Sequence, residues 1–216
     1  MTAVIVPAKP LESALSRLST VLDGPARTAI QQAMLIDVLC AAGDLTTTVT
    51  VVTADPTVAA LATAYGAAVV EEGTPAGGID AAVAQGIAAT GGGRVLVVMG
   101  DLPLATGEDL DALVRAAPDH GVAIARSADG TGTNAMVLTP AGVVATSFGP
   151  GSLERHRAEA RRRAVACVER TIDGLALDID TPRDLADLLA TGVDSHTLRM
   201  CDALDLRHRL APEATG

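Results

Sequence analysis

Short apolar runs typical of strands alternate with stretches of helical spacing, and this alternation constrains the fold more than any other feature of the chain. The runs that predict strands occupy residues 3–9, 48–55, 67–72, 94–99, 121–127 and 134–139. The helical stretches between them cover 25–42, 57–65, 79–89 and 107–117. Strands that alternate with helices in this way form βαβ units around a mainly parallel sheet. The sequence therefore predicts an α/β fold, with a mostly parallel central sheet and helices on both of its faces.

The last third of the chain changes in character. A strand over 164–170 follows an arginine-rich helix, and residues 175–189 predict a strand that runs into a helix beginning at Thr181-Pro182. A chain of 216 residues can bury one substantial core, so we expect a single domain over 1–216. The polar tail, 194–216, is expected to form a short helix or an arm.

The composition limits the core and the partners. The chain is 49% apolar but has one Phe, one Tyr and no Trp, so its core must consist of Ala, Val and Leu. Cys40, Cys167 and Cys201 lack metal or disulfide spacing, and we expect them to be buried small hydrophobic residues. No apolar run approaches the roughly 18 residues of a membrane span, which favours a cytoplasmic protein. The net charge of −10 argues against nucleic acid but permits a small phosphorylated ligand.

Polar residues and glycines gather where the predicted strands end. Ligands of open α/β sheets bind beyond the carboxyl ends of the strands. The residues that reach this edge are Pro7 and Lys9, Gly77 and Gly78, Gly100 and Asp101, and Asp178 and Asp180. Three acids, two glycine segments and the only lysine of the chain predict a magnesium–nucleotide site. A P-loop and a dinucleotide fingerprint are both excluded, because the first strand is followed by "VPAKPLES".

Asp180 and Asp101 each allow two interpretations. Residues two apart on a strand share a face, so Asp178 and Asp180 would stand roughly 6–7 Å apart and could flank one hard cation or help to hold two. Alternatively, Asp180 only caps the following helix and Asp178 ligates alone. Asp101 is either a metal ligand or a turn and N-cap residue.

Two cations and two loops are candidates for binding substrate anions. Lys9 and Arg17 could neutralise the β- and γ-phosphates of a nucleotide, or they could be solvated surface cations. The loops "GTGTN" (130–134) and "SFGPGS" (147–152) offer backbone N–H groups and hydroxyls that suit a small acidic ligand.

Several motifs in series resemble a known family. "VIVPAKPLESALSRLS", "AMLIDVLCAA", "VVMGDLPLAT", "DGTGTNAMVL", "FGPGSLERHRAEA" and "LDIDTPRDLADL" occur in this order over nearly the whole chain. Together they resemble the guanylyltransferase of coenzyme F420 biosynthesis, whose members activate 2-phospho-L-lactate or phosphoenolpyruvate with GTP. The resemblance implies a single-domain, Rossmann-like nucleotidyltransferase fold related to the molybdopterin guanylyltransferases.

The resemblance also implies roles for individual residues. It implies Mg²⁺ ligation by Asp101, Asp178 and Asp180, and contacts of Thr133, Gly149 and Ser152 with the phosphoenolpyruvate-like acceptor. The chain departs from the family in two places. Leu15 stands where a second lysine is frequent, so pyrophosphate binding would rest on Lys9 and Arg17. Asp80 stands where an asparagine is common, and it could still accept from guanine N1–H and N2–H₂.

The function that follows is the transfer of GMP from GTP to phosphoenolpyruvate or 2-phospho-L-lactate, with release of pyrophosphate. The acceptor phosphate is already anionic and needs no general base, while Mg²⁺ and Lys9 stabilise the leaving pyrophosphate. Two alternatives stay open: a nucleotidyltransferase for a molybdopterin or a sugar phosphate, and a non-catalytic nucleotide-binding module. The sequence leaves the oligomeric state open between a monomer and a homodimer.

Overall fold

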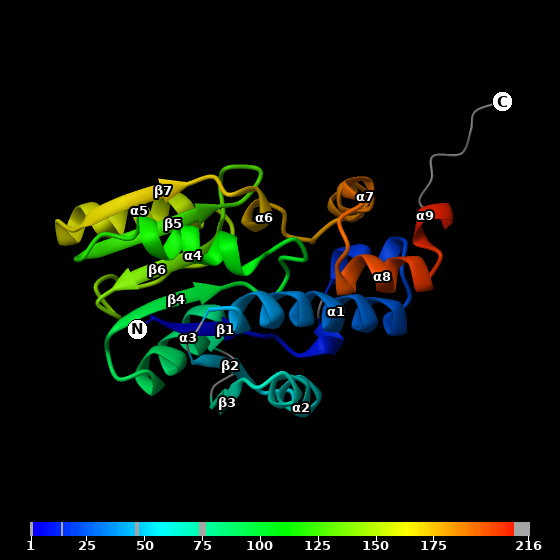
Figure 1. Ribbon diagram of the computed structural model, residues 1–216, viewed down its shortest axis with the longest axis horizontal. Helices are drawn as coiled ribbons and strands as arrows, with labels where there is room; N and C mark the ends of the chain where they lie inside the picture. Colours follow the sequence, from blue (N-terminus) through cyan, green and yellow to red (C-terminus); the bar gives the residue numbers. More distant parts are fainter. Residues whose placement is uncertain (1, 14, 46–47, 74–76, 210–216) are drawn as a thin grey trace.

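A seven-stranded sheet in the order β3-β2-β1-β4-β6-β5-β7 forms the centre of the computed structural model, which describes residues 2–13, 15–45, 48–73 and 77–209 (Figure 1). The strands are β1 (Thr2–Pro7), β2 (Val49–Thr53), β3 (Ala68–Glu71), β4 (Arg94–Val98), β5 (Gly121–Arg126), β6 (Thr133–Thr139) and β7 (Ala166–Arg170). All pairings are parallel except those of β6, which runs antiparallel to both β4 and β5. The predicted α/β fold with a mostly parallel sheet is confirmed.

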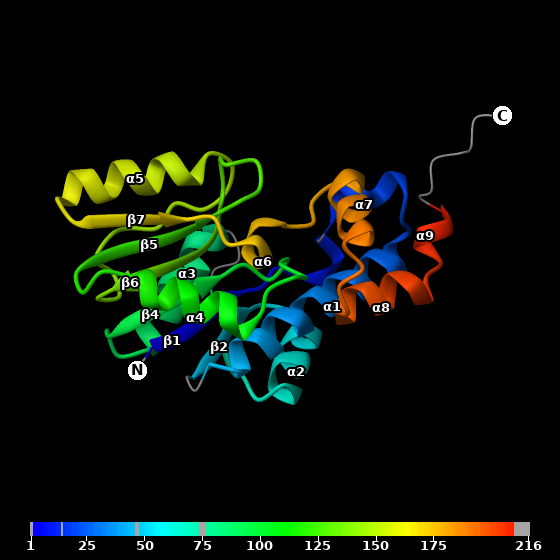
Figure 2. The same cartoon turned by 45° about the horizontal axis from the view of Figure 1, so that its top comes forward.

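Helices cover both faces of the sheet (Figure 2). The main ones are α1 (Gly24–Gly43), α2 (Pro56–Ala64), α3 (Gly78–Ala89), α4 (Gly107–Ala116) and α5 (Ser152–Arg163). Residues of α1, α2 and α4 share one apolar core with the sheet, and residues of α3 and α5 share the other. Both faces are therefore apolar, which explains why the central strands are almost uninterrupted apolar runs.

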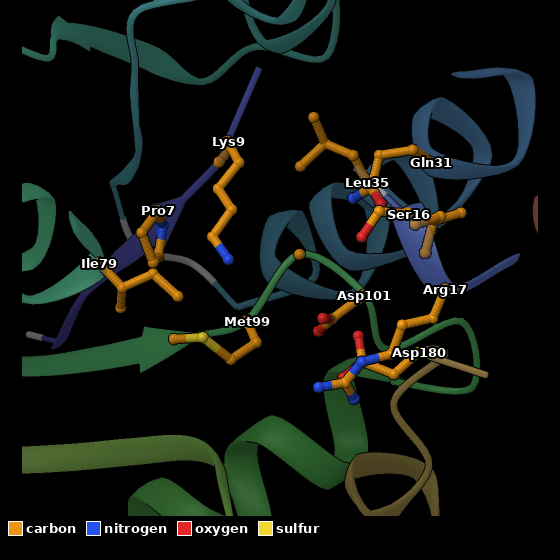
Figure 3. Close-up of a pocket in the computed structure, with 13 residues that line it drawn as sticks. Pro7, Lys9, Ser16, Arg17, Gln31, Leu35, Ile79, Met99, Asp101 and Asp180 are labelled. Atoms are coloured by element: carbon orange, nitrogen blue, oxygen red, sulfur yellow. The ribbon is translucent and has the colours of Figure 1, made fainter. Parts of the chain in front are cut away.

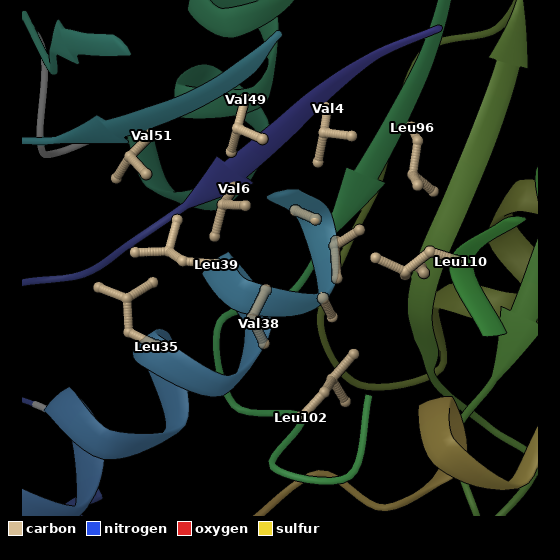
Figure 4. Packing of buried hydrophobic residues seen from close by; sticks show 14 of the residues in the cluster. Val4, Val6, Leu35, Val38, Leu39, Val49, Val51, Leu96, Leu102 and Leu110 are labelled. Atoms are coloured by element: carbon tan, nitrogen blue, oxygen red, sulfur yellow. The ribbon is translucent and has the colours of Figure 1, made fainter. Parts of the chain in front are cut away.

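The two cores consist almost entirely of aliphatic side chains, as the composition predicts. On β1, Val4 and Val6 belong to the core under α1, and Ile5 belongs to the core under α3, because side chains alternate along a strand. Figure 4 shows the first of these cores, with Leu35 and Val38 of α1 against the sheet. All five of these side chains are inaccessible or nearly so.

Four short helices follow β7. α6 (Asp173–Ala176) packs on the sheet, with Leu175 in the core under α1. α7 (Pro182–Thr191), α8 (His196–Ala203) and α9 (Leu206–Arg209) form a third cluster away from the sheet. Leucines of α7 and α8 pack on the N-terminal half of α1 and on the 3₁₀ helix η2 (Ser16–Thr20). Segments far apart in sequence thus lie side by side, as α1 and α8 do in Figure 1.

A buried carboxylate fixes α8 on α1. Both oxygens of Asp37 on α1 accept hydrogen bonds: Oδ1 from the N–H and Nδ1 of His196, and Oδ2 from the N–H and hydroxyl of Thr197. These bonds satisfy donors of the first turn of α8, which have no partner inside the helix. The part of the predicted tail from 196 to 209 forms two short helices, α8 and α9, with a turn between them, and residues 210–216 lie outside the described residues.

Two expectations about the last third and the cysteines are wrong. Residues 177–180 form no strand, because α6 precedes them and they lead directly into the Thr181 cap of α7. Cys40 and Cys167 are exposed, and only Cys201 is buried. Among the described residues, no helix is long and apolar enough to cross a membrane.

Replacing Asp37 should loosen the third cluster. We expect Asp37→Ala to lower the free energy of unfolding by about 2–4 kcal/mol, because it leaves four donors without their acceptor in a buried place. Denaturant unfolding measures the change. Asp187→Ala is the matched control, since its exposed carboxylate lies 3.9 Å from Arg183 and should contribute less than about 1 kcal/mol. Equal effects of the two substitutions would contradict the anchoring role of Asp37.

Candidate active site

A pocket of about 260 Å³ opens at the carboxyl ends of β1 and β4 (Figure 3). Residues from both strand ends, from η2 and from α1 line it: Pro7, Ala8, Lys9, Leu15, Ser16, Arg17, Gln31, Leu35, Ile79, Met99, Gly100, Asp101 and Asp180. The structure thus brings together Pro7, Lys9, Arg17, Gly100, Asp101 and Asp180, six of the residues that the sequence selected. Its place at the carboxyl edge is where ligands of such sheets bind.

Asp101 is the most constrained acid of this pocket. Its Oδ1 is buried and has no hydrogen-bond partner, and the N-cap of α4 is Thr106 rather than Asp101. Burial, then the charges of Asp178 and Asp180, raise the pKa of Asp101 to about 7, although Lys9 opposes the shift. A carboxylate oxygen that is buried without a donor is costly unless a cation joins it. Asp101 stands in a turn after β4, but it is not the N-cap of α4.

The other two acids lie beside Asp101 but have protein partners. Asp178 accepts from the Asn134 side-chain amide at 3.1 Å, and burial raises its pKa. Asp180 lies 3.3 Å from Arg17 in an ion pair, with 67% of the Arg17 side chain and 54% of the Asp180 side chain exposed. In the described ranges, no three acidic, His or Cys residues are close enough together to form a metal cluster. Asp180 also does not cap α7, because Thr181 and Asp184 form the capping box.

Cations and a leucine line the opposite side of the pocket. Lys9 extends from the end of β1 towards the side on which Asp101 lies, and Arg17 reaches from η2 to Asp180 (Figure 3). Leu15 packs into the third cluster. This wall of the pocket therefore carries two basic side chains.

A second, more apolar pocket of about 270 Å³ adjoins the first and shares Pro7, Ala8, Lys9 and Ile79 with it. Pro10, Gly78, Ala82 and Glu72 complete its lining. Glu72 is the one acid among the described residues of its lining, and sequence reasoning missed this residue. The signal was the pair "EE" directly after a strand, since alternation sends one of the two side chains to each face. Gly77, the N-cap of α3, stands next to this pocket in sequence without lining it.

Asp80, the residue predicted to contact the guanine base, lies in the first turn of α3. Its Oδ1 accepts from the Phe148 N–H at 3.0 Å, and it lines neither pocket. It thus ties α3 to the loop 147–151. Asp80 has a structural partner here.

The acceptor candidates gather around that same loop. Thr133 begins β6, and Ser152 begins α5 directly after Gly149 to Gly151. Thr133 and Ser152 are buried, and the Ser152 hydroxyl has no hydrogen-bond partner. In this loop of the described structure, the N–H groups of Gly149 and Gly151 also lack a partner. Free donors of this kind suit an anionic ligand.

The free energy of unfolding of the unliganded protein should depend on pH because the carboxyl of Asp101 is buried. Its pKa of about 7 exceeds the ordinary 3.8, so the folded state binds the proton more tightly and the free energy of unfolding should fall as pH rises from about 4 to 7. We expect Asp101→Asn to remove this loss and to be more stable than the parent protein by up to about 4 kcal/mol at pH 8. Unfolding in EDTA at pH 4 and pH 8 measures it. Asp119→Asn, with a fully exposed side chain, should keep the loss, and identical pH slopes for both variants would contradict the assignment.

Comparison with known proteins identifies the family. Residues 2–213 match the family described as "Guanylyl transferase CofC like". A phosphoenolpyruvate guanylyltransferase of Geodermatophilus obscurus is 40% identical over 203 residues, which are 90% of this chain and 91% of that protein. That of Sphaerobacter thermophilus is 36% identical over 192 residues, 87% of this chain and 92% of that protein.

A relative with a different printed acceptor and two solved structures extend the comparison. The 3-phospho-D-glycerate guanylyltransferase of Phenylobacterium zucineum is 31% identical over 204 residues, 91% of this chain and 93% of that protein. A nucleotidyl transferase from Methanothermobacter shares the fold with a TM-score of 0.64 at 19% identity, covering 92% of this chain and 98% of that one. CMP:2-keto-3-deoxy-manno-octonic acid synthetase shares it with a TM-score of 0.60 at 15% identity, covering 88% and 98%. The chain belongs to the CofC-like guanylyl transferase family.

Proposed function

We propose that this protein transfers GMP from GTP to phosphoenolpyruvate, in the biosynthesis of coenzyme F420. The observation that carries the proposal is the pocket at the ends of β1 and β4, where the partnerless oxygen of Asp101 lies across from Lys9. Family membership supports guanylyl transfer, and the acceptor comes from the names of the relatives. 2-Phospho-L-lactate and 3-phospho-D-glycerate are the competing acceptors, the latter because one relative carries its name.

The two adjoining pockets suit the two ends of a nucleotide. The apolar one between Pro7, Ile79 and Ala82 suits the flat faces of a base. There, the Glu72 carboxylate could accept from the N1–H and N2–H₂ of guanine, a donor pair that adenine lacks. The polar pocket with Lys9 and Arg17 suits the triphosphate. Gly77 and Gly78 open α3 beside the base, where the chain passes close to the ligand.

The acids supply the ligand type that a hard divalent cation prefers, although the described residues do not group three of them closely enough for a metal cluster. Carboxylate oxygens are the ligands that Mg²⁺ prefers, and the buried Oδ1 of Asp101 has no other partner. Asp101 would hold the ion together with Asp178 and Asp180, whose charges already raise the pKa of Asp101. When bound, Mg²⁺ would neutralise charge on the triphosphate. The pair of Asp180 with Arg17 would then open or shift, which frees Arg17 for phosphate.

The acceptor site joins the same sheet edge from the β6 side. Thr133, Gly149 and Ser152 supply donors to the acid, and the neighbouring Asn134 holds Asp178. An oxygen of the acceptor phosphate forms a bond to the α-phosphorus of GTP, and the bond from that phosphorus to the β-phosphate oxygen breaks. The electron pair leaves with pyrophosphate, whose growing charge Lys9 stabilises. No proton has to be removed, which agrees with a pocket whose lining contains neither His nor Cys.

Product formation tests the proposal directly. We expect GTP, Mg²⁺ and phosphoenolpyruvate to give pyrophosphate and a GMP adduct, measured by a coupled phosphate assay and mass spectrometry. Asp101→Asn should lower kcat by about 10²-fold or more, because the cation loses its most buried ligand. Asp119→Asn, remote from the pocket, is the control. Absence of pyrophosphate with phosphoenolpyruvate, 2-phospho-L-lactate and 3-phospho-D-glycerate alike would refute guanylyl transfer to these acids.

Base selectivity tests the placement of guanine. Glu72→Gln should lower kcat/KM for GTP by about 10-fold or more, because one acceptor for the N1–H and N2–H₂ pair becomes a donor. Glu71→Gln is a matched control, since Glu71 is the adjacent exposed residue and lines neither pocket. Selectivity for GTP over ATP should fall only in the first variant. Unchanged selectivity in both would exclude Glu72 as the reader of the base.

A further inference from the structure

We infer that His156 is a positioning residue that turns the Thr133 hydroxyl into a hydrogen-bond donor for the acceptor anion. The inference rests on the proposed function, because it concerns the acceptor site of that reaction. His156 lies in α5 and has no accessible surface, so it acts only through its neighbours. It lines neither pocket.

The hydrogen bonds of the ring determine its tautomer. The N–H of Ser147 donates to Nε2 of His156 at 2.9 Å, so Nε2 must carry a lone pair and no proton. The proton of the neutral ring is then on Nδ1, which lies 3.0 Å from the Thr133 hydroxyl oxygen. Nδ1–H therefore donates to Thr133, and the hydroxyl hydrogen of Thr133 remains free for another partner.

The surroundings keep the ring neutral. Burial lowers the pKa of His156 to about 4, and Asp80, which opposes this shift, does not overcome it. Arg155 lowers the pKa further. The Phe148 ring lies edge-on to the imidazole, with centroids 5.0 Å apart. At neutral pH the Ser147 N–H therefore determines the tautomer of His156. The tautomer in turn determines whether the Thr133 hydroxyl accepts from Nδ1 or donates to it.

The loop 147–151, next to the ring, also presents hydrogen-bond donors rather than acceptors. The Arg155 guanidinium accepts nothing and donates to carbonyl oxygens of the loop, those of Ser147, Phe148, Gly149 and Pro150. These carbonyls are thereby withdrawn from the acceptor site. The groups that remain are donors, namely the N–H groups of Gly149 and Gly151 and the hydroxyls of Thr133 and Ser152.

The direction of the Thr133 bond decides whether this donor set is complete. With the opposite tautomer, Thr133 would donate to Nδ1 and would present only a lone pair to the ligand. A carboxylate or phosphate can only accept, so that lone pair would repel it. Reversal of one hydrogen bond thus converts a favourable contact into an unfavourable one, without moving any heavy atom.

Two isosteric substitutions separate the two nitrogens of the ring. The side-chain amide of His156→Asn can occupy the place of Nδ1 and still donate to Thr133. That of His156→Gln reaches the place of Nε2 and can still accept from Ser147, but it leaves Thr133 without its donor. We expect His156→Gln to raise KM for phosphoenolpyruvate about 10-fold, with KM for GTP unchanged. We expect His156→Asn, which keeps the donor to Thr133, to raise KM for phosphoenolpyruvate much less.

A double-substitution cycle excludes a merely structural effect. Thr133→Val removes the hydroxyl at constant shape and should by itself raise KM for phosphoenolpyruvate about 10-fold. Adding His156→Gln to Thr133→Val should then change KM little further, because its only target is gone. Independent, multiplied effects of the two substitutions would overturn the inference.

A measurement that needs no turnover separates the test of the His156 role from the test of the proposed reaction. Nitrogen-15 NMR of the free protein should show His156 with a protonated Nδ1 and a bare Nε2 at neutral pH, and a protonated Nε2 would overturn the inference. Calorimetric titration with phosphoenolpyruvate, in the presence of a non-hydrolysable GTP analogue, gives the second readout. Failure of the parent protein to bind would refute the proposed function. Binding that is equal in the parent and in His156→Gln would refute only the role of His156.

Discussion

The antiparallel pairing of β6 with β4 is the constraint on which the rest of the site depends. Val98 at the end of β4 stands opposite Ala135, so the first residues of β6 arrive at the edge where the parallel strands end. Met99 continues the pairing by donating to the Asn134 carbonyl. A seventh parallel strand would have sent this start to the far edge of the sheet. The reversed strand places the start of β6 next to the end of β4, after which Asp101 follows.

The carboxyls of the candidate site outnumber its basic side chains. The chain carries a net charge of −10, and three carboxyls converge where Lys9 and Arg17 are the cations of the pocket. Two of the acids have protein partners, but Asp101 has none on its buried oxygen. The three carboxylates and two basic side chains leave one negative charge in excess, which a bound cation would offset.

Sequence reasoning reached most of the fold because the apolar periods of β1, β2, β4 and the helices are strong. It failed at 177–180, where "LDID" has the alternation of a strand but α6 and the Thr181 cap leave no strand between them. The pocket residues could be predicted because the ends of strands are visible in the sequence and ligands of such sheets bind at the carboxyl edge. Glu72 was missed although strand alternation gave a signal for it, and the contacts of Asp80 and His156 are with partners 68 and 23 residues away in the sequence. Spacing along the chain does not predict contacts of this kind.

The walls of the polar pocket belong to different hydrophobic cores. Lys9 and Asp101 follow strands of the sheet, whereas Arg17 and Asp180 stand beside Leu18 and Ile179 of the third cluster. α1 contributes to both, with Leu35 in one core and Met34 in the other. The width of this pocket therefore depends on how the sheet core and the third cluster pack against α1. Repacking of either core, away from the pocket itself, should change that width.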